Sequence, residues 1–294
     1  MKALAGEIRG TVTLQLRLGI WIVSAVVFVA IAAPWLTPHD PFAQQLPMRL
    51  RPPGAELGAG TSWLGTDAFG RDILSRLILG ARVSAAVGLA GALVGLAIGL
   101  PLGLMAGYLG GRVDALLRTL ADIQLGFPVF LLALALMAAV GAGLVNLIVV
   151  LGIARWPIYF RIARGEAQSL RTVAFVEASQ ALGAARSRIL ALHLLPNMLS
   201  PILVTATFGV ADAVLAEAGL SFLGFGVPVG VPSWGSMASE GTAYITRAWW
   251  VVFFPGLAIA VFVLGVNALG DGLRDRFDPR RNLQRAMDRT RRST

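Results

Sequence analysis

The chain alternates long apolar runs with shorter polar connections, and the longest runs match the thickness of a membrane. About 20 apolar residues in a helix, rising ~1.5 Å each, cross the hydrocarbon core of a bilayer. Six stretches approach or exceed this length, and they cover residues 18–36, 84–109, 116–140, 144–162, 196–215 and 249–269. The pattern therefore predicts an all-α polytopic membrane protein with six transmembrane helices.

The polar stretches around these spans give the expected domain organisation. We expect an N-terminal segment, a first span, a long outer loop, a main transmembrane domain and a basic tail, at residues 1–17, 18–36, 37–79, 80–274 and 275–294. The main domain contains two further polar connections, 175–196 and 217–248. The alternative for the first span is a cleaved signal peptide ending near Ala30–Ala32, but the run is longer than such a segment and ends at Pro34 and Trp35.

Composition supports the membrane class and excludes several kinds of chemistry. Hydrophobic residues make up 56% of the chain and charged residues 14%, with a mean hydropathy of +0.73, whereas soluble domains carry about 25% charged residues. There is no cysteine, and the two histidines, His39 and His193, lie far apart, so we expect no disulfide and no metal site. The net charge of +9 fits membrane orientation and contact with anionic lipid, and we expect no nucleic-acid partner.

Arginine placement predicts the orientation of the chain. Most basic residues fall in residues 1–17, at Arg112 and Arg118, between Arg155 and Arg188, and in the tail. Because cytoplasmic segments carry an excess of basic residues, we expect both termini and the 175–196 connection to be cytoplasmic.

Two local patterns concern packing. In the first outer loop, Asp72 and Arg76 are spaced as an i,i+4 ion pair at the start of a short helix. In the second span, glycines recur mostly every four residues and share one helix face, where close approach of another helix needs no side chain; they are Gly88, Gly91, Gly95, Gly99, Gly103 and Gly107.

An enzyme is excluded by the motif inventory. The sequence has no G-x-x-x-x-G-K-[ST], H-E-x-x-H, G-x-S-x-G or C-x-x-C, so we expect no catalytic residue and no cofactor bound by this chain. Acidic residues at or near span ends (Asp122, Asp212, Glu217 and Asp271) leave open a proton-coupled carrier. Capping or snorkelling at the membrane interface explains them more simply.

The polar stretch 175–196 is the candidate functional element. It reads as two short helical pieces broken at Gly183, and Pro196 opens the next span. Phe175, Ala178 and Leu182 share one small apolar face that could dock into a groove of a soluble partner. Movement of this element would move the fourth and fifth spans.

The same stretch carries a family resemblance. Glu177-Ala178-Ser179, Gly183 and then His193-Leu194-Leu195-Pro196 resemble the cytoplasmic coupling motif of binding-protein-dependent ABC importer permeases, in the variant of the dipeptide and oligopeptide (DppC/OppC-type) subunits. Further blocks resemble that branch in order along the chain: Gly65–Asp67 with Gly70–Asp72 and Ser75–Arg76; Arg161 with Arg164–Glu166; Glu217–Gly224 with Pro232–Gly235; and Gly270–Asp275 with Asp278–Pro279. Phe277 and Asp212 depart from the pattern.

The resemblance implies a MetI-like core of transmembrane helices with an extra N-terminal helix, in a bacterial or archaeal cytoplasmic membrane. It further implies a heterodimer with a sister permease, two ATPase subunits that bind ATP and Mg, and an extracytoplasmic binding protein. The implied ATPase-coupling residues are Phe175, Glu177, Ala178, Ser179, Leu182, Gly183, Arg186, Arg188, His193 and Pro196; candidates for the pathway or for binding-protein docking are Asp212, Glu217, Phe222 and Trp234. Asp212 could contact substrate or mark a water-exposed helix end.

The resemblance implies a peptide cargo, di- or oligopeptide, handed over by the binding protein. Near relatives carry nickel chelates, glutathione or opines, so the cargo stays open at this point. The competing class is a self-sufficient secondary transporter, which would need inverted repeats and a midplane polar site within one chain.

Overall fold

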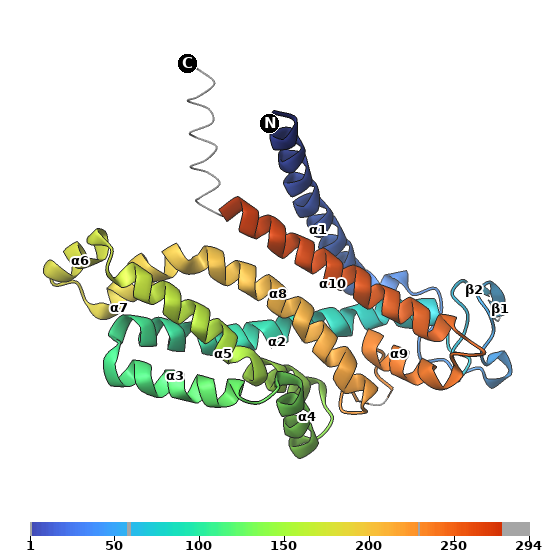
Figure 1. Cartoon of the computed structure of the whole chain (residues 1–294). Helices are drawn as coiled ribbons and strands as arrows, with labels where there is room; N and C mark the ends of the chain where they lie inside the picture. Colours follow the sequence, from blue (N-terminus) through green and yellow to red (C-terminus); the bar gives the residue numbers. More distant parts are fainter. Residues whose placement is uncertain (1, 58–59, 229, 278–294) are drawn as a thin grey trace.

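A computed structural model describes residues 2–57, 60–228 and 230–277, and it is almost entirely helical (Figure 1). The main helices are α1 (Lys2–Leu36), α2 (Ile73–Leu109), α3 (Gly111–Leu125), α4 (Val129–Val140), α5 (Leu144–Arg171), α6 (Ala174–Ala181), α7 (Arg186–Arg188), α8 (Leu195–Phe222), α9 (Trp234–Gly241) and α10 (Trp250–Phe277). Shorter elements are η1 (Leu46–Met48), the strands β1 (Ala55–Leu57) and β2 (Gly60–Ser62), the π-helical turn η2 (Ile189–Leu194) and η3 (Thr242–Tyr244). The basic tail lies outside the described residues from 278 onward.

Five helical segments are long and apolar enough to cross a membrane, and they lie in α1, α2, α5, α7–α8 and α10. The predicted third span is different. It is divided into α3 and α4, which meet at an angle of 87°. Pro128, which caps α4, cannot donate a backbone hydrogen bond and disfavours helical geometry at Phe127. The prediction of one continuous helix over residues 116–140 is therefore wrong, and the pair forms a broken span or a re-entrant segment.

The connection between α1 and α2, the predicted long outer loop, contains short regular elements. Strands β1 and β2 form a small antiparallel ribbon within it. The predicted short helix is the beginning of α2, which runs for 37 residues. Asp72 caps this helix by accepting from the Ser75 backbone N–H at 2.8 Å, and Arg76 pairs with other carboxylates. The predicted Asp72–Arg76 ion pair is therefore wrong, because the carboxylate is used for capping.

The glycine face of α2 lies against α5, as its spacing predicted. A Cβ on Gly95 would lie 3.1 Å from the Gly152 carbonyl oxygen, and a Cβ on Gly99 or Gly103 would overlap the backbone of α5 outright. Helices packed this closely exclude any side chain at the contact. The contact fixes α5 along the length of α2.

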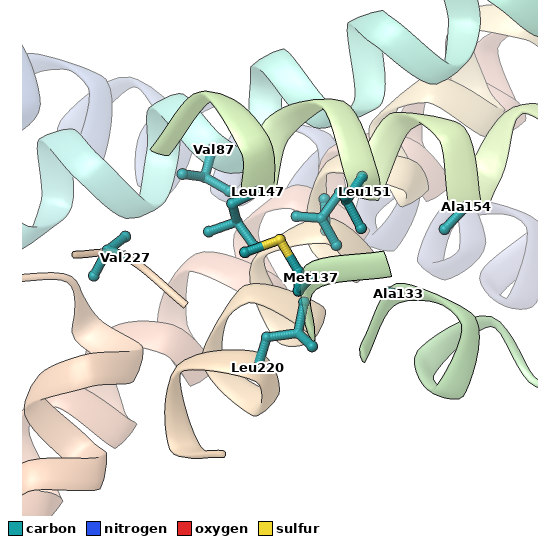
Figure 2. Packing of buried hydrophobic residues seen from close by; sticks show 10 residues of the cluster. Val87, Ala133, Met137, Leu147, Leu151, Ala154, Leu220 and Val227 are labelled. Carbon is teal, nitrogen blue, oxygen red and sulfur yellow. The ribbon is translucent and has the colours of Figure 1, made fainter. Parts of the chain in front are cut away.

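Apolar side chains from four helices, α2, α4, α5 and α8, form a core toward one end of the bundle. Met137 of α4 lies beside Leu147 of α5, and Leu220 of α8 lies below them in the view (Figure 2). This cluster attaches the bent α4 to the main helices. A second cluster joins α2, α5, α6 and α8 at the other end, so both ends of α5 are held.

Helix α1 packs along α10 and also contacts α2 (Figure 1). The contact is close, because a Cβ on Gly19 would lie 2.8 Å from the Leu269 Cα. Figure 1 also places α6 and α7 at one end of the molecule and β1, β2 and α9 at the other. The predicted polar connections thus form the two ends of the bundle.

Candidate functional site

The polar element between α5 and α8 folds as a helical hairpin at one end of the bundle. Helix α6 ends at Ala181, and Gly183 follows with φ = +77°, a backbone conformation that residues with a side chain rarely adopt. The Gly183 N–H donates to the Gln180 carbonyl, and the Ala184 N–H donates to that of Ser179. The predicted break at Gly183 is confirmed.

The second piece of the element differs from the prediction. From Arg186 the chain passes through the π-helical turn η2 directly into α8, with no break before Pro196. A π-helical turn closes wider hydrogen-bonded rings than an α-helix does. A proline within a helix removes one backbone N–H donor. Pro196 therefore continues a helix that begins before it, and α7, η2 and α8 form one rod.

Helix α6 is anchored by a single apolar side chain. Val176 is fully buried with Ile189 and Leu194 of the following rod. Phe175 and Leu182 remain 42% and 88% exposed. The apolar surface named in the sequence is thus available for contact, while the residue that attaches α6 to the bundle was not among the predicted ones. Sequence reasoning missed Val176 because the side of α6 that faces the bundle depends on where the helix begins and ends.

Polar contacts set the angle between α6 and the rod. The Ser179 Oγ lies 3.4 Å from the His193 Nε2, and the rings of Phe175 and His193 are 6.1 Å apart. Ser179 and His193, the two positions at which the motif varies, therefore lie side by side. Glu177 is exposed on α6, and Arg186 and Arg188 are exposed on α7.

A cavity of about 520 Å³ opens between this hairpin and the ends of α2 and α5. Its lining mixes apolar and charged side chains from four helical segments: Tyr108, Leu109, Arg171, Thr172, Glu177, Gln180, Ala184, Arg186 and Ile189. Gln180 and Tyr108 form a hydrogen bond across it at 3.4 Å. The concave, partly polar surface suits contact with a soluble protein.

Three arginines on α5 form ion pairs with neighbouring helices. Arg155 pairs with Asp212 of α8 at 2.6 Å, and Arg161 pairs with Asp122 of α3 at 2.7 Å. A third pair, closer to the hairpin, joins Arg164 to Asp114 of α3 through both carboxylate oxygens. These arginines were missed as site residues because the charge count assigned them to a cytoplasmic connection.

These pairs correct the interpretation of the acidic residues. Asp122 and Asp212 were expected to cap helices or to reach the membrane interface, but each meets an arginine on α5. Asp212 lies inside α8, and Arg155 lies inside α5. An arginine within an apolar run is itself a signal, since charged residues are rare there.

At the opposite end, Glu217 holds the loop after α8 in place. It is fully buried, and its carboxylate accepts hydrogen bonds from Ser221 and Ser233 at 2.7 Å each and from Ser84 at 3.5 Å. Trp234 is also buried and donates to the Leu77 carbonyl. Both side chains are packed inside the chain, whereas Phe222 is 57% exposed. A role of these residues in the pathway or in binding-protein docking stays a prediction.

A buried charge network joins the first outer loop to α9. Arg76, 2% exposed, bonds to Asp67 and to Glu240, the latter at 2.9 Å. Arg71 bonds to the same two carboxylates at 2.6 and 2.9 Å. The partner, Glu240, lies more than 160 residues further along the chain, so sequence spacing gave no sign of it.

Metal-ligating side chains do not gather within the described part of the chain. No group of three or more histidine, cysteine or acidic side chains there could hold a metal ion. The functional geometry therefore consists of the hairpin and its cavity, the paired charges in the spans, and the clamped outer loops.

Comparison with known proteins gives matches over nearly the whole chain. Residues 99–283 match the family model described as binding-protein-dependent transport system inner membrane component, and residues 17–53 match the N-terminal transmembrane domain of oligopeptide transport permease C. A putative peptide transport system permease protein of Brucella abortus is 42% identical over 91% of this chain and 88% of its own length. The dipeptide transport system permease protein DppC of Escherichia coli is 44% identical over 89% of this chain and 88% of its own.

The fold also matches a solved structure. The MetNI methionine ABC transporter, in an inward-facing conformation, has a chain that aligns with a TM-score of 0.59 at 21% identity, over 69% of this chain and 97% of that one. At this identity the likeness concerns the fold, which is the MetI-like arrangement of helices.

Proposed function

The chain belongs to the family of binding-protein-dependent transport system inner membrane components, as a permease of the DppC/OppC type, and we propose that it imports di- or oligopeptides as part of an ABC transporter. It is a multi-pass membrane protein and a transport subunit rather than a catalytic one. The peptide cargo is supported by relatives that are named for peptide transport and cover about nine-tenths of the chain.

The proposed assembly contains four kinds of subunit. This chain and a homologous sister permease form the pathway, two ATPase subunits bind ATP and Mg on the cytoplasmic side, and a binding protein delivers peptide on the other side. In this proposal both termini lie in the cytoplasm, which the arginine distribution supports. The sequence has no phosphate-binding loop of its own, so a partner has to supply the nucleotide chemistry.

The observation that carries the coupling role is the way the hairpin is built. Phe175 and Leu182 are exposed while Val176 is fully buried, so α6 presents an apolar surface and is attached from behind. The rod α7–η2–α8 begins in this hairpin and continues through the membrane. A partner that displaces α6 would therefore move α5 and α8 together.

In this proposal, the ATPases contact α6 and the Gly183 turn, with Glu177, Ala178 and Leu182 at the centre and Arg186 and Arg188 at the rim. Closure of the ATPases on ATP pulls the hairpin and turns the bundle outward, so that the binding protein releases its peptide. Ser179, His193 and Pro196 act indirectly by fixing the angle of α6.

The test is reconstitution of the complete complex in proteoliposomes with its binding protein. Uptake of a labelled peptide that requires internal ATP is the expected result, and Leu182→Asp should abolish it while the permease pair still assembles. Val173→Asp, exposed just before α6, is the control for charge at this surface. Peptide uptake by the purified chain alone would contradict the proposal.

Cargo is tested on the binding protein, because that subunit selects the substrate. Calorimetry with dipeptides, longer peptides, glutathione, nickel chelates and opines should show binding for the peptides. If the binding protein binds only another class of compound, the proposal of an importer stands and the proposed cargo changes to that class.

A further inference from the structure

The Arg155–Asp212 ion pair lies near the middle of the membrane. Arg155 is about 16 Å along α5 from Leu144, and Asp212 is about 15 Å along α8 from Phe222, at ~1.5 Å per residue. Leu144 and Phe222 are the ends of the two helices on the same side. Half the hydrocarbon thickness is about 15 Å, so both charges lie close to the midplane when these two helix ends are taken as the edge of the hydrocarbon.

This pair is open on one side. The Arg155 side chain is 14% exposed, whereas the Asp212 side chain is 50% exposed. Both terminal guanidinium nitrogens reach the same oxygen, Oδ2, at 2.6 and 2.9 Å. Among the described residues none donates to Oδ1, so the carboxylate keeps an acceptor directed away from its partner.

A half-exposed carboxylate at this depth does not face lipid. A charged side chain at the bilayer centre costs at least about 2.5–3.5 kcal/mol, and such residues face water-filled cavities or other protein. Leu215, one turn further along α8, is 49% exposed, so the surface around the charge is apolar. Ligand sites are usually lined by apolar side chains with a few charged or polar groups among them, and this surface has that composition.

The neighbouring turn offers one more polar atom. The Tyr159 hydroxyl, one turn from Arg155, is buried with no hydrogen-bond partner among the described residues. It lies against Gly209, one turn from Asp212, where a Cβ would overlap it. An unpaired buried hydroxyl costs about 1–3 kcal/mol, and water or a ligand group entering between α5 and α8 would satisfy it.

The other two ion pairs on α5 do not combine an unpaired carboxylate oxygen with a position that faces α8. Arg164 and Asp114 use both carboxylate oxygens and are 20% and 15% exposed, which is a closed pair joining two helices. Arg161 is six residues from Arg155, which turns it by about 120° around the helix, toward α3. Only Arg155–Asp212, among these three pairs, presents a free carboxylate oxygen on the face shared by α5 and α8.

We propose that Arg155 and Asp212 form a substrate site that exchanges its internal ion pair for the two charged ends of a short peptide. The guanidinium binds the peptide α-carboxylate through two N–H groups, and the Asp212 carboxylate accepts from the peptide α-ammonium. When the peptide leaves, the two side chains pair again. This inference rests on the proposed import of peptides, and it adds the groups of the peptide that the permease itself contacts.

Water access is the first test; because this chain has no cysteine, it needs no background mutations itself, and labelling is read on this chain after it is separated from its partner subunits. In the complete transporter, Asp212→Cys should react with a charged methanethiosulfonate reagent, and excess transported peptide should slow the reaction about tenfold. Leu264→Cys is the control, because Leu264 is 65% exposed in the middle of α10 and should not react. Equal labelling of both cysteines, or no protection by peptide, would overturn the site.

Transport by charge-neutral variants is the second test. Asp212→Asn should reduce uptake of a free-amine peptide about tenfold, the loss of one charge-assisted hydrogen bond, and should leave uptake of its N-acetylated form at the wild-type level. Arg155→Gln should reduce uptake of a peptide with a free C-terminal carboxylate about tenfold. It should leave uptake of the C-amidated form of that peptide at the wild-type level. Arg161→Gln is the matched control and should not discriminate between these peptides.

Uptake of each peptide by a variant is compared with uptake of the same peptide by the wild-type transporter, at a saturating concentration of loaded binding protein. Differences in how well the binding protein selects these peptides then cancel. Equal loss for free and blocked peptides would show a structural role and overturn the proposal, as would unchanged uptake. Absence of peptide uptake by the wild-type transporter would instead contradict the proposed function, so the two failures are distinguishable.

Discussion

Gly103 of α2 lies directly against the backbone of Phe160 in α5, and a Cβ on Gly103 would overlap the Phe160 carbonyl oxygen. Gly95, Gly99 and Gly107 meet α5 in the same way at successive turns. Since α5 leads into the hairpin of α6 and α7, this contact makes α2 the fixed support along which α5 is aligned.

Replacing Gly103 should separate these helices. Gly103→Leu is expected to destabilise the permease by about 1–3 kcal/mol or more, the cost of overpacking, and to lower the thermal midpoint of the purified complex. The measurement is thermal unfolding monitored by fluorescence-detected size exclusion. Gly165→Ala is the control, because nothing lies within 4 Å of a Cβ there; a similar loss in both variants would contradict the role of this contact.

Val176 should connect α6 to the bundle. Val176→Ala removes buried methyl groups that contribute on the order of 1–2 kcal/mol, and we expect ATP-driven uptake to fall several-fold while peptide binding by the binding protein is unchanged. Val173→Ala, at a position 38% exposed, should retain uptake. Equal uptake by both variants would show that α6 does not depend on this anchor.

Glu217 should act through its hydrogen bonds rather than through substrate contact. Glu217→Ala leaves the hydroxyls of Ser221 and Ser233 without their acceptor and should cost about 1–3 kcal/mol each. Glu217→Gln keeps one acceptor oxygen and should retain most of the stability. Thermal midpoints of the two variants give the comparison, and the same midpoint for both would contradict the role assigned to the acceptor.

The outer charge network should depend on its buried carboxylate more than on its exposed one. Asp67→Asn leaves Arg71 and Arg76 buried with one charge partner fewer and should cost about 3–5 kcal/mol. Glu240→Gln should cost less, because Glu240 is 36% exposed and water can solvate the change. Protease sensitivity of the first outer loop reports the difference, and the reverse order would show that Glu240 is the principal partner.

Much of the candidate site could be predicted because its signals are local. The bend at Gly183 follows from the conformation of a single residue, and the glycine face of α2 follows from helical periodicity. The broken third span also had a local signal that the apolar count overlooked, since α3 carries Arg118, Asp122 and Gln124 whereas α4 is apolar throughout. Pro128 separates the two helices.

By itself, the sequence determined the membrane class, the positions of five spans, the polar stretch 175–196 with its break at Gly183 and the family, because hydrophobicity, periodicity and motif spacing are properties of the chain. The tertiary structure alone decided that Asp212 meets Arg155, that Glu240 meets Arg76 and that Glu217 is buried among serines. Each of these contacts joins helices or loops distant in sequence. Their partners are selected by the packing angle and register of whole helices, which no local pattern specifies.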